Sequence, residues 1–406
     1  MLLVAGALGC AFPNHRHDLR IRDPIPTDPA GFSLVLEQST GGPMAAGNQV
    51  ELVENGKVFD ALEAEILKAE HSLNLAPFIW RNSAPSDRLV TAVLNRLSHG
   101  VRCRILIDPF WSLDFNQVAH TLGNAGCEIR EYRPIRANLG KRILLRTHRR
   151  AVVIDGKVGI TGGFGVWKSW QGEGLKKEEW RDSNLLLRGP VVRQLQMSFA
   201  DNWQEAGGAL LPASDFPPLE PVGDIRAGLV SSDANLNMSD AERMTLLMIA
   251  TAQKRLWIAN AYFIPSTAMG DMLIEKAKEG VDVRILCPGP VHDVPPVRAA
   301  QRSTYERLLV GGVRIYEYQP SMMHAKTMVV DDRYTVVGST NLDPLSAKWL
   351  EETSVVVDDP ALNAQLSTSL EADFTRSLEI RWAWWRKRGL IERLAMALTP
   401  LVGAFL

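Results

Sequence analysis

The spacing of hydrophobic residues changes at regular intervals along the chain. Ser239-Asp240-Ala241-Glu242 forms a capping box, and the apolar residues after it recur on one helical face as far as Gln253. Short apolar runs lie between such helical stretches and predict strands. We predict helices at 58–69, 87–98, 239–253 and 268–278, and strands at 72–78, 101–107, 255–261 and 281–286. This alternation predicts an α/β sandwich in each half of the chain.

A long internal repeat organises the sequence. His99–Leu106 recurs as Glu279–Leu286, and Gly126–Pro134 recurs as Gly312–Pro320 at a similar offset. His148 to Asp155 recurs in the same way as His324 to Asp331. Offsets that stay nearly constant over this distance indicate duplicated domains rather than chance similarity.

The boundaries of the two copies follow from composition. A stretch rich in Pro and Gly at 207–224 is the natural linker, and 406 residues suit two domains better than one. We predict an N-terminal segment close to the membrane (1–47), a first domain (48–206), the linker (207–224), a second domain (225–375) and a C-terminal tail (376–406).

Both ends of the chain carry membrane-related patterns, although no run reaches the ~20 apolar residues of a spanning helix. Met1–Phe12 is apolar but lacks the positive n-region of a signal peptide, and Ala7-Leu8-Gly9-Cys10 loosely resembles a lipoprotein processing site; the favoured alternative is a frayed or misannotated start. The tail 376–406 combines basic residues with three tryptophans and predicts an amphipathic helix. Such a helix lies either in a membrane surface or against its own domain.

Overall composition narrows the classes of function. The 45 Lys and Arg balance 46 Asp and Glu to a net charge of −1, which argues against a wholly basic nucleic-acid coat. With 46% hydrophobic and 22% charged residues the chain is not of a disordered type. The four cysteines show neither paired spacing nor C-x-x-C. We therefore expect no disulfide framework, no zinc knuckle and a reducing compartment.

One histidine in each copy stands in a repeated setting. On a strand, residues i and i+2 share a face, so His324 points with Lys326 and His148 with Arg150. An imidazole beside a fixed cation suits an anionic phosphate ester. The aspartate of each motif, Asp155 or Asp331, follows seven residues after its histidine, which places it on the opposite face in an unbroken strand. Its position therefore favours a role in shaping the turn.

The paired H-x-K-x4-D motif with a downstream G-S-x-N resembles the phospholipase D superfamily. Flanking segments such as Tyr262-Phe263-Ile264-Pro265 and Trp180-Arg181-Asp182 are similar to bacterial cardiolipin synthases, and the likeness runs from about residue 48 to the C-terminus. It implies an α/β fold of two pseudo-symmetric α/β/α sandwich domains of the phospholipase D type. One active site would lie at their interface.

The resemblance also implies the residues of that site, without a metal or a cofactor. The matching catalytic positions are His148, Arg150, Asp155, His324, Lys326 and Asp331, and the substrate-binding or orienting positions are Gly163, Asp182, Ser339, Asn341 and Glu352. Three departures from the family pattern stand out. Arg150 replaces a lysine, Gly165 replaces an asparagine, and Leu345 and Leu350 fill positions that are usually Arg and Asn.

The function implied is that of a phosphatidyltransferase that works through a phosphohistidine. Its partners would be phosphatidylglycerol and a membrane surface, without nucleic acid. The protein would lie peripherally at the cytoplasmic face of a bacterial cell membrane, with Cys10 as a candidate lipid anchor. A phospholipase D-type hydrolase or nuclease, and a catalytically impaired lipid-binding protein, remain alternatives. The basic run 128–150 favours a rim that attracts headgroups over a merely solvated face.

Overall fold

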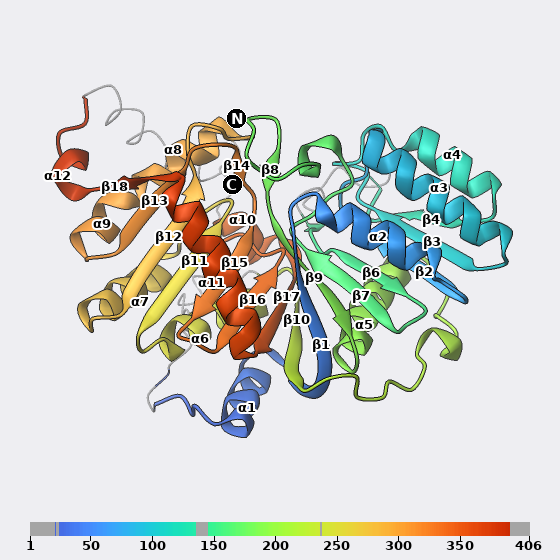
Figure 1. Cartoon of the computed structure of the whole chain (residues 1–406), viewed down its shortest axis with the longest axis horizontal. Helices are drawn as coiled ribbons and strands as arrows, with labels where there is room; N and C mark the ends of the chain where they lie inside the picture. The colour runs from blue at the N-terminus through green and yellow to red at the C-terminus, as the bar shows by residue number, and fades with distance from the viewer. Residues whose placement is uncertain (1–20, 22–23, 135–144, 236–237, 390–406) are drawn as a thin grey trace, which may run out of the picture.

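The chain is described by a computed structural model that covers residues 21, 24–134, 145–235 and 238–389. Two α/β halves lie side by side, and their central strands meet in the middle of the molecule (Figure 1). Both halves contribute to one continuous sheet. The predicted α/β fold with two related halves is confirmed.

The first half repeats strands and helices in the predicted order. Two predicted helices match the structure closely. The helix predicted at 87–98 is observed as Ala84–Ser98 in this half, and the helix predicted at 239–253 is observed as Asp240–Thr251 in the second half. The elements of the first half are β1 (Ala45–Glu54), α2 (Lys57–Leu67), β2 (Ser72–Ala76), α3 (Ala84–Ser98), β3 (Arg102–Ile107), α4 (Asn116–Asn124), β4 (Glu128–Glu131), β5 (Arg146–Thr147), β6 (Ala151–Ile154), β7 (Val158–Gly162), the short 3-10 helix η3 (Lys168–Trp170), β8 (Trp180–Arg181), β9 (Ser183–Arg188) and α5 (Val191–Glu205).

The second half has the same plan with one more helix before its third parallel strand. Its first helix begins at the capping box, where Ser239 Oγ accepts a hydrogen bond from the backbone N–H of Glu242. The elements are β10 (Ile225–Ser232), α6 (Asp240–Thr251), β11 (Arg255–Asn260), α7 (Thr267–Lys278), β12 (Asp282–Pro288), α8 (Pro295–Ser303), α9 (Tyr305–Val310), β13 (Arg314–Tyr318), β14 (Met322–Met323), β15 (Lys326–Val330), β16 (Tyr334–Gly338), α10 (Pro344–Lys348), β17 (Leu350–Asp358) and α11 (Pro360–Thr375).

The strand order displays the internal symmetry. From the centre outward, the first half runs β1-β9-β7-β6-β2-β3-β4, and the second half runs β10-β17-β16-β15-β11-β12-β13. The central strands β1 and β10 are antiparallel to each other. In each half the three outer strands are mutually parallel, so the loops that follow them emerge at one edge of the sheet.

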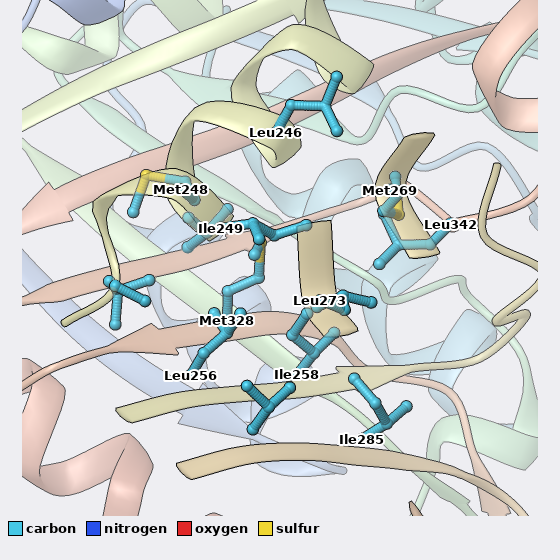
Figure 2. Packing of buried hydrophobic residues seen from close by; sticks show 14 of the residues in the cluster. Leu246, Met248, Ile249, Leu256, Ile258, Met269, Leu273, Ile285, Met328 and Leu342 are labelled. Atoms are coloured by element: carbon cyan, nitrogen blue, oxygen red, sulfur yellow. The ribbon is translucent and has the colours of Figure 1, made fainter. Parts of the chain in front are cut away.

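Three hydrophobic clusters cover the sheet. One lies beneath the helices of the first half and one beneath those of the second, where Leu246, Ile249, Ile258 and Leu273 interdigitate (Figure 2). The third cluster packs α5 and α11 against strands of both halves. Burying apolar area on both sides of the seam stabilises the halves as one unit.

Segments outside the two halves are attached to them. Helix α1 (Pro29–Thr40) precedes the first half and contacts α6. The linker region 207–224 contains a 3-10 helix, η4 (Ala213–Asp215), whose fully buried Asp215 pairs with Arg102 and Arg104 at 2.7 Å. None of the helices in the described part of the chain is long and apolar enough to cross a bilayer.

The C-terminal tail differs from the helix predicted over 376–406. Residues 377–380 form strand β18 (Ser377–Ile380), which pairs with β13 at the edge of the sheet, and only α12 (Trp382–Trp385) is helical before residue 390. Trp385 is buried against Tyr305, while Trp384 is exposed. This part of the tail is therefore docked on its own domain. The remainder, like Met1–Phe12 and Cys10, lies outside the described residues.

A disulfide corrects the prediction made from the cysteine spacing. Cys103 on β3 and Cys127, directly before β4, are joined by an S–S bond. Their sequence separation carries no recognisable pattern, but β3 and β4 are adjacent parallel strands, and this register brings the two side chains together. The repeat places Val283 and Val313 at the equivalent positions in the second half, where both are buried. The expectation of a disulfide-free chain is therefore wrong.

Candidate active site

Each motif histidine follows a two-residue strand that pairs with the opposite half. Strand β5 runs parallel to β17, and strand β14 runs parallel to β8. The pairing continues into the histidines: the N–H of His148 donates to Glu351 O at 2.8 Å, and the N–H of His324 donates to Arg181 O at 2.7 Å. The fold thus brings the two motifs to the seam between the halves.

The carboxylate that orients each imidazole comes from the other half. His148 Nδ1 lies 2.9 Å from both carboxylate oxygens of Glu352, and His324 Nδ1 lies 2.7 Å from Asp182 Oδ2. A carboxylate on Nδ1 fixes the ring orientation and the tautomer, which leaves Nε2 as the nitrogen available for chemistry. The structure therefore brings together four of the predicted site residues as two crossed pairs.

Each carboxylate receives a further hydrogen bond, but from different kinds of donor. Ser339 Oγ donates to Glu352, whereas the indole Nε1 of Trp170 donates to Asp182 Oδ2 at 2.8 Å. Gly163 is the counterpart of Ser339 in the repeat, and a Cβ there would lie 2.2 Å from Asp182 Oδ1. Gly163 thus leaves room for the carboxylate, and Trp170 supplies the donor that the first motif lacks.

The same tryptophan explains the missing asparagine of the first motif. A Cβ on Gly165 would lie 2.9 Å from the Trp170 ring, so the ring occupies the space that a side chain at this position would need. The counterpart, Asn341, is buried in the second half, and its Oδ1 has no hydrogen-bond partner among the described residues. The Trp170 ring in one half thus takes the place of a side chain whose amide oxygen has no hydrogen-bond partner among the described residues of the other half.

The two motif cations adopt the same position despite their different chemistry. Arg150 Nη1 donates to the carbonyl of His148 and Lys326 Nζ to that of His324, each at 2.6 Å. Burial lowers the pKa of Lys326 to about 7 and that of Arg150 to about 10. Arg150 therefore keeps its positive charge at neutral pH, where Lys326 is near its midpoint.

The electrostatic states of the two pairs differ. Burial and then the Lys326 cation lower the pKa of His324 to about 4. Burial alone would raise the pKa of Asp182, but its partner His324 holds that pKa near 2. Burial lowers the pKa of His148 well below its usual value, helped by the charges of Arg150, Lys326 and His324. Burial also raises the pKa of Glu352 to about 8. The charge of His324 is among the causes that lower the pKa of His148, which places the two imidazoles within electrostatic reach of each other.

Asp155 and Asp331, the third members of the motifs, lie outside this site. Both adopt positive φ angles in turns at the far ends of β6 and β15. Asp155 accepts hydrogen bonds from the N–H groups of residues 70–72, and Asp331 from those of residues 253–255. These hydrogen bonds agree with the turn-shaping role that their spacing indicates, and the structure does not bring either aspartate to the imidazoles.

In the part of the basic run 128–150 that the structure describes, the arginines do not form an open, unpaired rim of the kind expected to attract headgroups. Its described arginines are paired with acidic side chains or buried: Arg130 with Glu128, Arg133 with Glu205, Arg146 with Asp108 and Arg149 with Asp201. Arg150 serves the site itself. Arg136, Lys141 and Arg142 lie outside the described residues.

Aromatic side chains that enclose the imidazoles escaped the sequence analysis. Trp180 stacks on His324 with ring centroids 4.8 Å apart, and Trp170 approaches the same ring edge-on at 5.1 Å. Phe78 contacts His148 edge-on at 4.6 Å and holds the Arg150 guanidinium over its face. Only Trp180 had a sequence indication, because it precedes Arg181-Asp182 in a recognisable flank. These rings cover the imidazoles, and both histidines are buried.

Comparison with known proteins identifies the family. A family model described as "Cardiolipin synthase, PLD-like domain" matches residues 62–203 and 246–374. The chain is also 30% identical over 408 residues to cardiolipin synthase 1 of Bacillus anthracis, an alignment that covers 96% of this chain and 79% of the relative. The chain belongs to the cardiolipin synthase family. It is thus an enzyme of the phosphatidyltransferase type.

Other cardiolipin synthase relatives and solved structures agree. Cardiolipin synthase A of Pseudomonas aeruginosa is 32% identical over 379 residues, which cover 91% of this chain and 76% of the relative. The phosphatidylserine synthase of Haemophilus influenzae has the same fold, with a TM-score of 0.65 at 13% identity over 92% of this chain and 96% of that one. In the described part of the chain, no three His, Cys, Asp or Glu side chains gather as a metal site would require.

Proposed function

We propose that this cardiolipin synthase family member transfers a phosphatidyl group to the glycerol hydroxyl of phosphatidylglycerol at a membrane surface. Phosphatidylglycerol also serves as the donor, so that cardiolipin and glycerol are the products. The observation that carries the proposal is the crossed arrangement of two imidazoles, each oriented by a carboxylate from the opposite half.

Two displacements at phosphorus account for the transfer. One imidazole attacks the donor phosphorus, the P–O bond to glycerol breaks, and the other imidazole gives its proton to the departing oxygen. That second imidazole then takes the proton of the acceptor hydroxyl, whose oxygen attacks phosphorus and breaks the P–N bond. Arg150 and Lys326 hold the phosphate oxygens during both steps.

A single assay separates the proposal from its alternatives. Purified protein is incubated with phosphatidylglycerol vesicles without added metal, and the lipids are resolved. Cardiolipin with glycerol supports the transferase, phosphatidic acid alone indicates hydrolysis, and vesicle binding without turnover indicates an impaired lipid-binding protein. We expect His148→Ala and His324→Ala each to abolish turnover, because neither imidazole can take both roles at once. Near-normal activity in either variant would refute the shared site.

The disulfide supports a location on the outer side of the membrane. Disulfides persist in oxidising compartments, whereas the cytosol keeps thiols reduced. We therefore place the domains on the extracytoplasmic face, in contrast to the cytoplasmic face implied by the resemblance. Cells lysed with an alkylating agent should yield the Cys103–Cys127 peptide cross-linked. Recovery of both cysteines as alkylated thiols would contradict this placement.

A further inference from the structure

An exposed apolar loop, residues 108–115, follows β3 and takes no part in the site described above. Phe110 is 43% exposed, Trp111 38% and Leu113 68%. Three large apolar side chains turned to solvent within four residues are unusual in a folded protein, and such clusters mark protein or membrane contacts.

Buried groups hold this loop firmly in place. Asp108 is fully buried, binds Arg146 through two hydrogen bonds of 2.7 and 2.8 Å, and accepts the N–H of Phe110. Ser112 Oγ donates to Phe78 O at 3.2 Å and accepts the N–H of Trp80 at 3.1 Å. Because the buried Asp108 and Ser112 fix the backbone on either side, Phe110, Trp111 and Leu113 are held with their side chains in solvent.

The loop lies at the edge of the sheet that carries the imidazoles. Strands β2 and β3 are parallel, so the segments that follow them emerge together. Phe78, after β2, contacts the His148 ring at 4.6 Å and the Trp111 ring at 6.0 Å. In the second half, the exposed segment Val294-Pro295-Pro296 follows β12 in the equivalent place.

We propose that the 108–115 loop inserts into the surface of an anionic phospholipid bilayer and presents the site to the lipid headgroups. This inference rests on the proposed function. The substrate keeps its acyl chains in the bilayer, because each methylene adds to the cost of removal. The buried imidazoles reach its phosphorus only if this edge of the sheet meets the membrane.

The chemistry of the loop suits this occupant. Tryptophan favours the membrane interface, where its ring is buried and its N–H stays solvated. Arg81 Nε donates to Trp111 O at 3.2 Å and places a cation at the base of the loop, at the level of lipid phosphates. A protein partner seated here would cover the entrance for the lipid substrate, which favours the bilayer over a protein.

Vesicle sedimentation with the full chain tests the loop. The double variant Phe110→Ser/Leu113→Ser should bind vesicles of phosphatidylglycerol and phosphatidylcholine at least tenfold more weakly than wild type. The matched control is Leu34→Ser/Val310→Ser, which removes two side chains that are 54% and 65% exposed. Leu34 is on α1, whose Phe32 stacks on Tyr334 at the start of β16, and Val310 ends α9 before the start of β13. The starts of β16 and β13 are strand ends opposite those that carry the imidazoles. The control should bind as wild type does.

Two further measurements keep the test decisive. Leu113→Trp should bind vesicles more tightly than wild type, and both Leu113→Trp and the double variant should turn over dispersed short-chain phosphatidylglycerol normally, which shows that neither is misfolded. Unchanged vesicle binding in the double variant, or an equal loss in the control, overturns the proposal, as does lost turnover of the dispersed lipid. If wild type makes no cardiolipin while binding still depends on the loop, the proposed reaction fails and the membrane contact stands.

Discussion

Replacement of Trp170 by phenylalanine tests how the first motif works without its asparagine. Trp170→Phe keeps an aromatic ring against Gly165 and His324 but removes the 2.8 Å hydrogen bond to the fully buried Asp182. Asp182 retains the bonds from His324 and from the N–H of Ser183. A hydrogen bond to a charged group contributes about 1.5–3 kcal/mol, which corresponds to roughly 10- to 100-fold in rate when the charge matters in the transition state.

The assay is cardiolipin formation as a function of pH and lipid concentration. We expect kcat to fall by about 10- to 100-fold with little change in KM, since Trp170 acts through Asp182 rather than on the lipid. The acidic limb of the kcat profile should move to higher pH, because a weaker partner raises the pKa of Asp182 above its present value near 2. The matched control is Trp180→Phe, which keeps stacking on the same imidazole.

Two results would contradict this role of the Trp170 indole. Equal losses in Trp170→Phe and Trp180→Phe would mean that packing alone matters, and activity of Trp170→Phe within twofold of wild type would show that the indole N–H is dispensable.

A double-mutant cycle with Gly165→Asn provides a second test. Because the new side chain collides with the Trp170 ring, Gly165→Asn should inactivate the wild type but cost less when combined with Trp170→Ala.

Three other predictions concern stability. Cys103→Val/Cys127→Val should retain activity, because the repeat has valines at these positions, and should lose about 3 kcal/mol of unfolding free energy from the opened 24-residue loop, measured by urea titration. Asp331→Ala should destabilise the chain by about 2 kcal/mol, and Asp331→Asn by less, since asparagine tolerates the φ of 50°. The pKa of His324 is about 4 in the folded protein, below its unfolded value of about 6.5. The unfolded chain therefore binds a proton more readily, and up to about 3 kcal/mol of stability is lost as the pH falls from about 6.5 toward 4. His324→Gln should reduce this loss in urea titrations compared at about pH 7 and pH 4.5.

Each of these has an opposing result. An inactive but folded valine pair would assign the disulfide a role in the site. Equal destabilisation by Asp331→Ala and Asp331→Asn would show that backbone conformation is irrelevant at this turn. A pH dependence of stability that is unchanged in His324→Gln would trace the acid sensitivity to other groups.

The sequence predicts those features that depend on local period and on repetition. The repeat of His148 and His324 predicts two halves and a shared site, and the i, i+2 rule places Arg150 and Lys326 beside them. The resemblance adds Asp182 and Glu352, but not the crossing of the pairs in space. That crossing depends on the two-residue strands β5 and β14, whose parallel partners, β17 and β8, are distant in the sequence and share no recognisable pattern with them.

Other features depend on contacts that a linear pattern does not contain. The disulfide follows from the register of β3 and β4, and neither the spacing of Cys103 and Cys127 nor their number indicates it. The role of Trp170 follows from the space beside Gly165. In the tail, the tryptophans and arginines suggest a surface helix, but Ser377–Ile380 finds a free sheet edge and forms a strand instead.

The crossing of the two histidine–carboxylate pairs has a consequence for the history of the duplicated gene. A repeat that borrows its orienting acid from its twin cannot drift alone, since a change in one copy disturbs the imidazole of the other. The first motif fits this constraint: it departs from the family pattern at Arg150 and Gly165, yet it supplies Asp182, on which the imidazole of the other copy depends, together with the indole donor of Trp170.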